Sequence, residues 1–145
     1  MTDADRIRIN REAWTRRAAS GPGIRLRRFE AFDLELSLQL GLRLFDGEAR
    51  VAQPPTPAEH RIEMYAFGYL LAVDSATAEA AAALGWEPFR DELLKPWLRT
   101  LTPPALGVIV AELAATLAEM EAGTVNPKSA APSCDGDGEP APPNT

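Results

Sequence analysis

The sequence predicts an α+β protein with a helix-dominated C-terminal half and a β-containing, arginine-rich N-terminal half. Two observations support this fold class. Apolar residues recur at three- and four-residue spacing in the stretch from 56 to 122, and apolar and polar residues alternate from 32 to 45. The proline-rich stretch 53–57 separates the two halves. The alternative is an all-α bundle.

The alternating stretch 32–45 reads FDLELSLQLGLRLF. On a strand its apolar side chains form one face, whereas on a helix every second residue turns by about 200° and the apolar side chains spread around the axis. Asp46-Gly47 is a favoured hairpin turn, and the segments 24–27 and 7–9 could supply partner strands. Leucine, glutamate, glutamine and arginine are helix formers, however, and the stretch has no β-branched residue. A helix ending at Asp46-Gly47 therefore remains the rival.

The second half carries clear signals for helix starts and stops. Thr56 and Glu59 form a capping-box pattern with Pro57 at the first helical position. Similar signals predict three further segments: one capped by Asp74-Ser75 and stopped by Gly85, one from Pro88 to about Arg99 that Pro96 interrupts, and one from Thr102 to Gly123.

The length of 145 residues suits one domain, which we place at 1–123. The remaining residues, 124–145, are rich in proline and acidic residues and almost lack large apolar side chains. Such a segment cannot bury enough surface to offset its ordering entropy, so it is predicted to be a disordered tail.

Charge and cysteine content limit the classes of function. The net charge of −6 argues against general affinity for nucleic acids or membranes, although eight arginines lie within the first 28 residues. The single cysteine, Cys134, excludes an internal disulfide and a cysteine-based metal site. The charged start MTDADRIRIN lacks the apolar stretch of a secretory signal, and no window is long and apolar enough to span a bilayer. A cytoplasmic location is expected.

No catalytic motif stands out, so the chain is predicted not to be an enzyme and to need no cofactor. His60 is the only imidazole base, Cys134 lies in the predicted tail, and no phosphate-binding glycine loop is present. His60 and Glu63 share a helix face and could ligate a metal, which makes a carboxylate-metal enzyme one alternative. Glu59 and Glu63 are explained more simply by the cap and the helix dipole, so no metal ligand is assigned.

The other alternative, which comes before the metal enzyme, is a regulator that associates with nucleic acid through its arginine-rich N-terminus. Arginine at every second position is also typical of the solvent face of a strand, and no recognition-helix pattern follows. The candidate phosphate contacts are Arg16, Arg17, Arg25, Arg27 and Arg28.

The preferred function is binding without catalysis, as a small protein-interaction or assembly factor. Its helices would present an apolar groove to a protein partner. The layout is similar to that of small assembly chaperones such as those of tailed-phage tails, but no motif carries this likeness. Tryptophan and tyrosine are enriched in binding hot spots, although the same aromatic side chains could instead fill the core. The candidate partner contacts are Trp86, Phe89, Trp97, Tyr65 and Tyr69.

Overall fold

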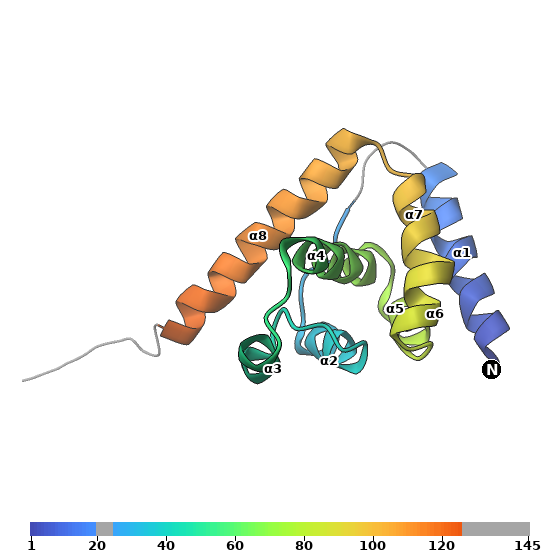
Figure 1. The fold of residues 1–145 in the computed structure, drawn as a ribbon. Helices are drawn as coiled ribbons and strands as arrows, with labels where there is room; N and C mark the ends of the chain where they lie inside the picture. The colour runs from blue at the N-terminus through green and yellow to red at the C-terminus, as the bar shows by residue number, and fades with distance from the viewer. Residues whose placement is uncertain (20–24, 126–145) are drawn as a thin grey trace, which may run out of the picture. The chain divides into compact units, whose positions relative to one another are not determined.

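The computed structural model describes residues 1–19 and 25–125 (Figure 1). The chain forms two compact units, Met1–Glu112 and Leu113–Thr145. The described elements are α1 (Asp3–Ala19), α2 (Ala31–Gln39), α3 (Gly47–Ala52), α4 (Pro57–Ala72), α5 (Ser75–Ala82), α6 (Trp86–Phe89), the π-helical turn η1 (Arg90–Leu94), α7 (Lys95–Arg99) and α8 (Pro103–Val125). The predicted tail lies outside the described residues except for its first two positions, which are helical.

The fold class α+β is wrong, and the all-α alternative fits. Residues 1–19 and 25–125 contain no strand. The segment 7–9, which was expected to form a partner strand, lies within α1. Of the other expected partner strand, 24–27, the residue Ile24 lies outside the described residues, and the rest is irregular.

Only the first part of the alternating stretch, up to Gln39, forms a helix, and its buried positions follow a helical period. This helix ends before the Asp46-Gly47 stop that the rival prediction gave. In α2 and the residue after it, the buried side chains are Asp33, Leu36, Ser37 and Leu40, which are spaced by three and four residues. Two of these buried side chains, Asp33 and Ser37, are polar, and both form hydrogen bonds. Two apolar residues of the alternation, Phe32 and Leu38, are instead exposed by 42% and 39%. The helical pattern of burial therefore replaces the period-two pattern up to Leu40. Beyond it, Leu42 and Leu44 are buried in a non-helical segment that keeps the alternation.

The predicted hairpin turn at Asp46-Gly47 is a helix start. The Asp46 side chain accepts a hydrogen bond of 3.1 Å from the backbone N–H of Ala49 and so caps α3. Aspartate is one of the strongest N-cap residues because its carboxylate satisfies a backbone donor that the first helical turn leaves unpaired. The same two residues are thus suited to a turn and to a cap, and sequence alone does not distinguish these structures.

The helix starts predicted at Thr56 and Asp74 are confirmed. Thr56 and Glu59 form the expected capping box, with Pro57 as the first residue of α4. Asp74 caps α5 through a 2.9 Å hydrogen bond from the backbone N–H of Thr77. Gly85, whose φ is +85°, separates α5 from α6 in a conformation that favours glycine.

Two predicted boundaries in this half differ from the structure. The third helical run begins at Trp86, earlier than Pro88, and continues to Arg99 through the π-helical turn η1. The last helix continues beyond Gly123 to Val125.

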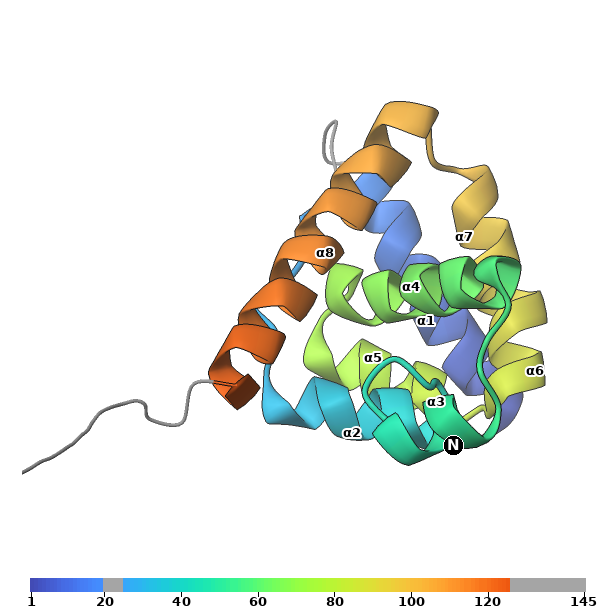
Figure 2. The ribbon, with the colours of Figure 1, turned by 60° about the vertical axis from the view of Figure 1, so that its left-hand side comes forward.

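The core of the first unit is centred on α4 and α5. Helix α4 contacts α2, α5 and η1, while α1 packs on α5 and η1, as Figures 1 and 2 show. Full burial of large apolar side chains contributes roughly 1.5–3 kcal/mol each. Those that are almost fully buried in this unit include Phe67, Tyr69, Leu70, Leu71, Phe89, Leu93, Leu94 and Ile109.

Candidate functional site

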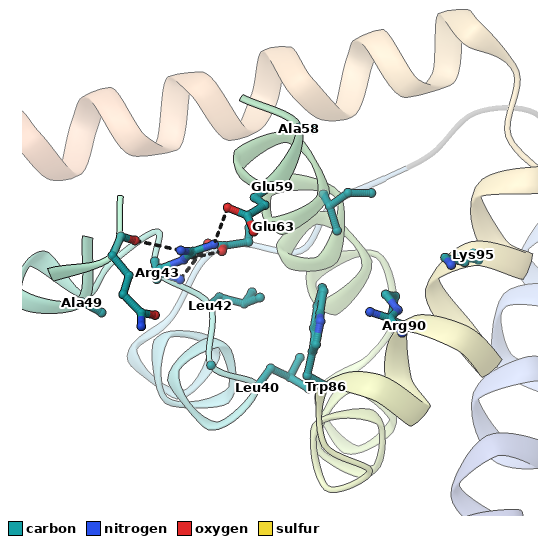
Figure 3. A pocket seen from close by; sticks show the side chains of 13 residues that line it. Leu40, Leu42, Arg43, Ala49, Ala58, Glu59, Glu63, Trp86, Arg90 and Lys95 are labelled. Carbon is teal, nitrogen blue, oxygen red and sulfur yellow. Dashed lines mark hydrogen bonds and ion pairs between the residues drawn. The ribbon is translucent and has the colours of Figure 1, made fainter. Parts of the chain in front are cut away.

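An open cleft lies on the first unit beside the N-terminal half of α4. Its volume is about 670 Å³. The loop after α2 and helix α3 form one wall, the start of α4 forms a second, and the run from α6 to α7 forms the third (Figure 3). The run from α6 to α7 therefore meets two earlier segments, 40–53 and 58–63, at this site.

The floor of the cleft is apolar. Leu40 and Leu42 are buried, and Ile62 and Trp86 are half-buried and line the same space. The Trp86 indole stands between the leucines and Arg90 in Figure 3. A half-buried indole offers a large, rigid apolar surface, which is the type of surface that dominates binding energy in protein interfaces.

Arg43 holds one end of the cleft together. Its backbone N–H donates to Glu63 Oε1 at 2.7 Å, and its Nε donates to Glu63 Oε2 at 2.9 Å. Its Nη1 donates to the carbonyl oxygen of Gln53 at 2.8 Å, and Nη2 lies 3.4 Å from Glu59 Oε1. The hydrogen bond with Glu63 is the main cause that raises the pKa of Arg43. These contacts connect the loop after α2 to α3 and α4, so Arg43 fixes this wall.

Proline determines the shape of the opposite wall. Pro96 has no N–H, so the carbonyl oxygen of Glu92, four residues earlier, lacks its normal helical donor. Arg11 of α1 supplies the missing donors, with Nε at 3.2 Å and Nη2 at 2.9 Å from that oxygen. The helix widens into η1, where the N–H of Lys95 donates to the carbonyl oxygen of Arg90.

Two cations of this wall line the cleft and share one carboxylate. Arg90 Nε lies 2.9 Å from Asp91 Oδ1, and Lys95 Nζ lies 3.7 Å from the same oxygen. Both cations are among the lining residues of the cleft. The hydrogen bond between Arg90 and Asp91 is the main cause that raises the pKa of Arg90 and lowers the pKa of Asp91. The three side chains are a third to a half exposed, so water and solutes can reach them.

The predicted partner contacts divide into two groups. Tyr69, Phe89 and Trp97 are buried, and the Tyr69 ring meets the other two at centroid distances of 5.3 and 5.2 Å. Trp86 and Tyr65 are half-buried, and Trp86 lines the cleft. Of the five aromatic residues, Trp86 has the position that a partner contact requires, and partner binding itself stays a prediction.

The predicted phosphate contacts differ in how exposed they are. Arg16, Arg25 and Arg28 are exposed, while Arg17 is outside the residues whose side chains are described. Arg27 is half-buried and points into the protein. Its guanidinium bonds Asp33 at 2.9 Å and the carbonyl oxygen of Leu70 at 2.6 Å, and it also bonds the carbonyl oxygen of Val73. Arg27 therefore satisfies the C-terminal end of α4.

His60 and Glu63 do not converge with further candidate metal ligands. In residues 1–19 and 25–125, no three histidine, cysteine, aspartate or glutamate residues are grouped to hold a metal ion. Both oxygens of Glu63 already accept hydrogen bonds from Arg43. Cys134 lies outside the described residues.

Sequence reasoning missed Arg43, Arg90 and Lys95, the cations that line the cleft. The signal that could have found two of them is Pro96, because a proline inside a helical pattern implies a local change in the helix.

In the part of the chain that the structure describes, no helix is both long and apolar enough to cross a bilayer. Comparison with protein-family models, curated proteins and solved structures finds no match for this chain. The cleft is therefore interpreted from its own side chains.

Proposed function

We propose that this chain is a non-enzymatic protein-interaction factor, of the adaptor or assembly type, that binds a segment of a protein partner in the cleft. The observation that supports it most directly is the half-buried Trp86 on an apolar floor in an open cleft of about 670 Å³. Binding pockets are typically apolar with a few polar groups placed at the edge. The Arg43 cluster and the pair of Arg90 and Lys95 are polar edges of this kind.

The rigidity of the walls also supports binding. Arg43 bridges three segments through hydrogen bonds of 2.7–2.9 Å, and α6 to α7 is a continuous helical run anchored to α1 by Arg11. A cleft that is already formed costs little ordering entropy when its partner binds. The same rigid arrangement places no nucleophile beside a base among the lining residues, which is why we propose binding and not catalysis.

Site-specific photo-crosslinking in cells that express the chain natively tests this function. A photo-crosslinking amino acid at Ile62, inside the cleft, should form an adduct with one protein partner. The same amino acid at Val51, which is 82% exposed on α3 and does not line the cleft, is the control. The Ile62 adduct should be lost in the Trp86→Ala variant. Equal adducts at both positions, or none at Ile62, would contradict the proposal.

A further inference from the structure

The π-helical turn η1 brings two cations to the same cleft. In an α-helix, residues five apart point about 140° away from each other. A turn closed by a hydrogen bond between residues five apart places them nearly one above the other. Arg90 and Lys95 are five apart, and the N–H of Lys95 donates to the carbonyl oxygen of Arg90. Both side chains consequently line the cleft.

The distances show that Arg90 and Lys95 can contact the same carboxylate oxygen. Asp91 Oδ1 lies 2.9 Å from Arg90 Nε and 3.7 Å from Lys95 Nζ. Asp91 Oδ2 also accepts a hydrogen bond of 3.3 Å from Arg90 Nη2. Glu87, on the same run, adds a weaker attraction to Arg90. Asp91 thus occupies the position that a carboxylate from outside would need.

The charge of the cleft differs in sign from that of the chain. The lining side chains include three cations and two carboxylates, whereas the whole chain has a net charge of −6. The two lining carboxylates, Glu59 and Glu63, already contact Arg43. Arg90 and Lys95 contact one carboxylate, that of Asp91, which is not a lining residue. The two cations beside the Trp86 indole therefore carry one positive charge more than this partner.

From this geometry we infer that the cleft selects an acidic segment of its protein partner. A carboxylate of the segment replaces Asp91 between Arg90 and Lys95, and a neighbouring apolar side chain lies on Trp86. Asp91 is then a built-in competitor that lowers affinity and excludes segments without a carboxylate. This inference rests on the proposed function, because it names the chemistry of the segment that the cleft binds.

A display library of random short peptides, selected on the full chain, tests the inference. Peptides that depend on Trp86 should be enriched in Asp or Glu beside a large apolar residue. Each selected peptide is then synthesised with a fluorescent label, together with an analogue in which Asn or Gln replaces the acid. Fluorescence anisotropy should show weaker binding of the neutral analogue and weaker binding of the acidic peptide at higher salt.

Three variants, compared with two control variants, test the contributions of Arg90, Lys95 and Asp91 separately. Arg90→Gln and Lys95→Gln should each weaken the acidic peptide by about threefold to tenfold, whereas Arg99→Gln, an exposed cation of the same run that does not line the cleft, should have no effect. Asp91→Asn should tighten the acidic peptide by about threefold, because the competing carboxylate is gone. Glu79→Gln on α5 is the matched control for the loss of a negative charge.

The possible outcomes distinguish the two proposals. A second variant, Ile62→Gln, tests the other half-buried apolar residue of the cleft. If no selected peptide loses binding in the Trp86 variant or in Ile62→Gln, the proposed binding function of the cleft is wrong. If peptides bind in a Trp86-dependent way but prefer neutral or basic residues, the binding function stands and the acidic specificity is overturned. Weaker or unchanged binding in Asp91→Asn would overturn the role of Asp91 as a competitor.

Discussion

Two clusters of arginine and aspartate in the first unit have the same chemistry and opposite surroundings. In the first, Arg27 bonds Asp33, whose side chain is 1% exposed. Its guanidinium also bonds the carbonyl oxygens of Leu70 and Val73, while its backbone N–H bonds that of Leu71 at 2.7 Å. In the second, Arg90 bonds Asp91, whose side chain is 49% exposed, and its guanidinium contacts no backbone carbonyl among the described hydrogen bonds.

The comparison indicates that burial determines whether an ion pair is accessible to a binding partner. A charge removed from water is costly unless hydrogen bonds replace its hydration. Both oxygens of the buried Asp33 carboxylate accept such bonds, one from Arg27 and one from the backbone N–H of Glu30, so the carboxylate of the Arg27 cluster is saturated. An exposed pair adds little to folding and exchanges readily with water and solutes. The Arg27 cluster therefore belongs to the fold, and the Arg90 cluster is available for binding.

The largest expected effect is on the saturated cluster. Arg27→Met keeps the apolar stem but removes the guanidinium donors to one oxygen of Asp33 and to the carbonyl oxygens of Leu70 and Val73. We expect a loss of about 3 kcal/mol in the free energy of unfolding, the lower end for a broken buried pair because Arg27 is partly exposed. Urea denaturation followed by circular dichroism measures it. Arg25→Met, at an exposed neighbouring position, is the control. Equal losses in both variants would show that Arg27 does not hold the end of α4.

A buried neutral pair between α1 and α4 provides the next test of the same rule. The Tyr69 hydroxyl donates to Asn10 Oδ1 at 2.7 Å, and Asn10 Nδ2 donates to the carbonyl oxygen of Arg6 at 2.9 Å. Tyr69→Phe removes one partner and leaves the Asn10 oxygen buried, which should cost about 1–2 kcal/mol of unfolding free energy. Urea denaturation at neutral pH measures this loss. Tyr65→Phe, at a half-buried position on the same helix, is the control.

The same hydroxyl gives a pH dependence with a definite sign. Burial raises the pKa of Tyr69 above its ordinary value of about 10. The folded state then holds this proton where the unfolded state releases it, so the stabilisation is complete below pH of about 10 and is lost as the pH rises above it. The loss should approach about 1.4 kcal/mol per pH unit in the parent chain. Tyr69→Phe should lack this part of the decline. A parallel decline in both chains would contradict the assignment.

Sequence reasoning predicted the helical half well because its signals are local. The capping box and proline at Thr56-Pro57 and the N-cap at Asp74 act within one turn, and both of these helix starts are confirmed. The helical part of the stretch 32–45 was misassigned because two of its buried residues, Asp33 and Ser37, are polar. Asp33 can face inward only because Arg27 and the end of α4 surround it, and no periodicity of apolar residues reports such a contact.

The cleft was less predictable than the fold. An apolar groove was expected and Trp86 was among its candidates, but four of the five aromatic candidates do not line it. Its charged residues depend on three segments that meet only in the folded chain, and on a helix that widens where Pro96 removes a donor. Local sequence indicated a break at Pro96, whereas the structure keeps the helical run continuous because Arg11 of α1 replaces that donor.

A smaller effect tests that replacement. Arg11→Met should lower the free energy of unfolding by about 1 kcal/mol, reduced from the usual value for a charged hydrogen bond because the Arg11 side chain is 46% exposed. In a Pro96→Ala background the new N–H can donate to the Glu92 carbonyl oxygen, so the cost of Arg11→Met should fall by about half. A double-mutant cycle in urea measures this coupling. Additive effects would mean that Arg11 stabilises α1 in another way.

The smallest effect on stability is expected at the cluster that we assign to binding. In Arg90→Gln and Lys95→Gln, Asp91 loses a contact but remains solvated, so the urea midpoint should equal that of the parent chain within error. The same variants should weaken binding of an acidic peptide, whereas Arg27→Met should change binding only in proportion to the protein that it unfolds. A clear drop in the urea midpoint of Arg90→Gln would mean that the ion pair of Arg90 and Asp91 stabilises the fold, as the pair of Arg27 and Asp33 does. The contrast between the two clusters would then be wrong, because an ion pair that the fold requires cannot open to bind a carboxylate of a partner.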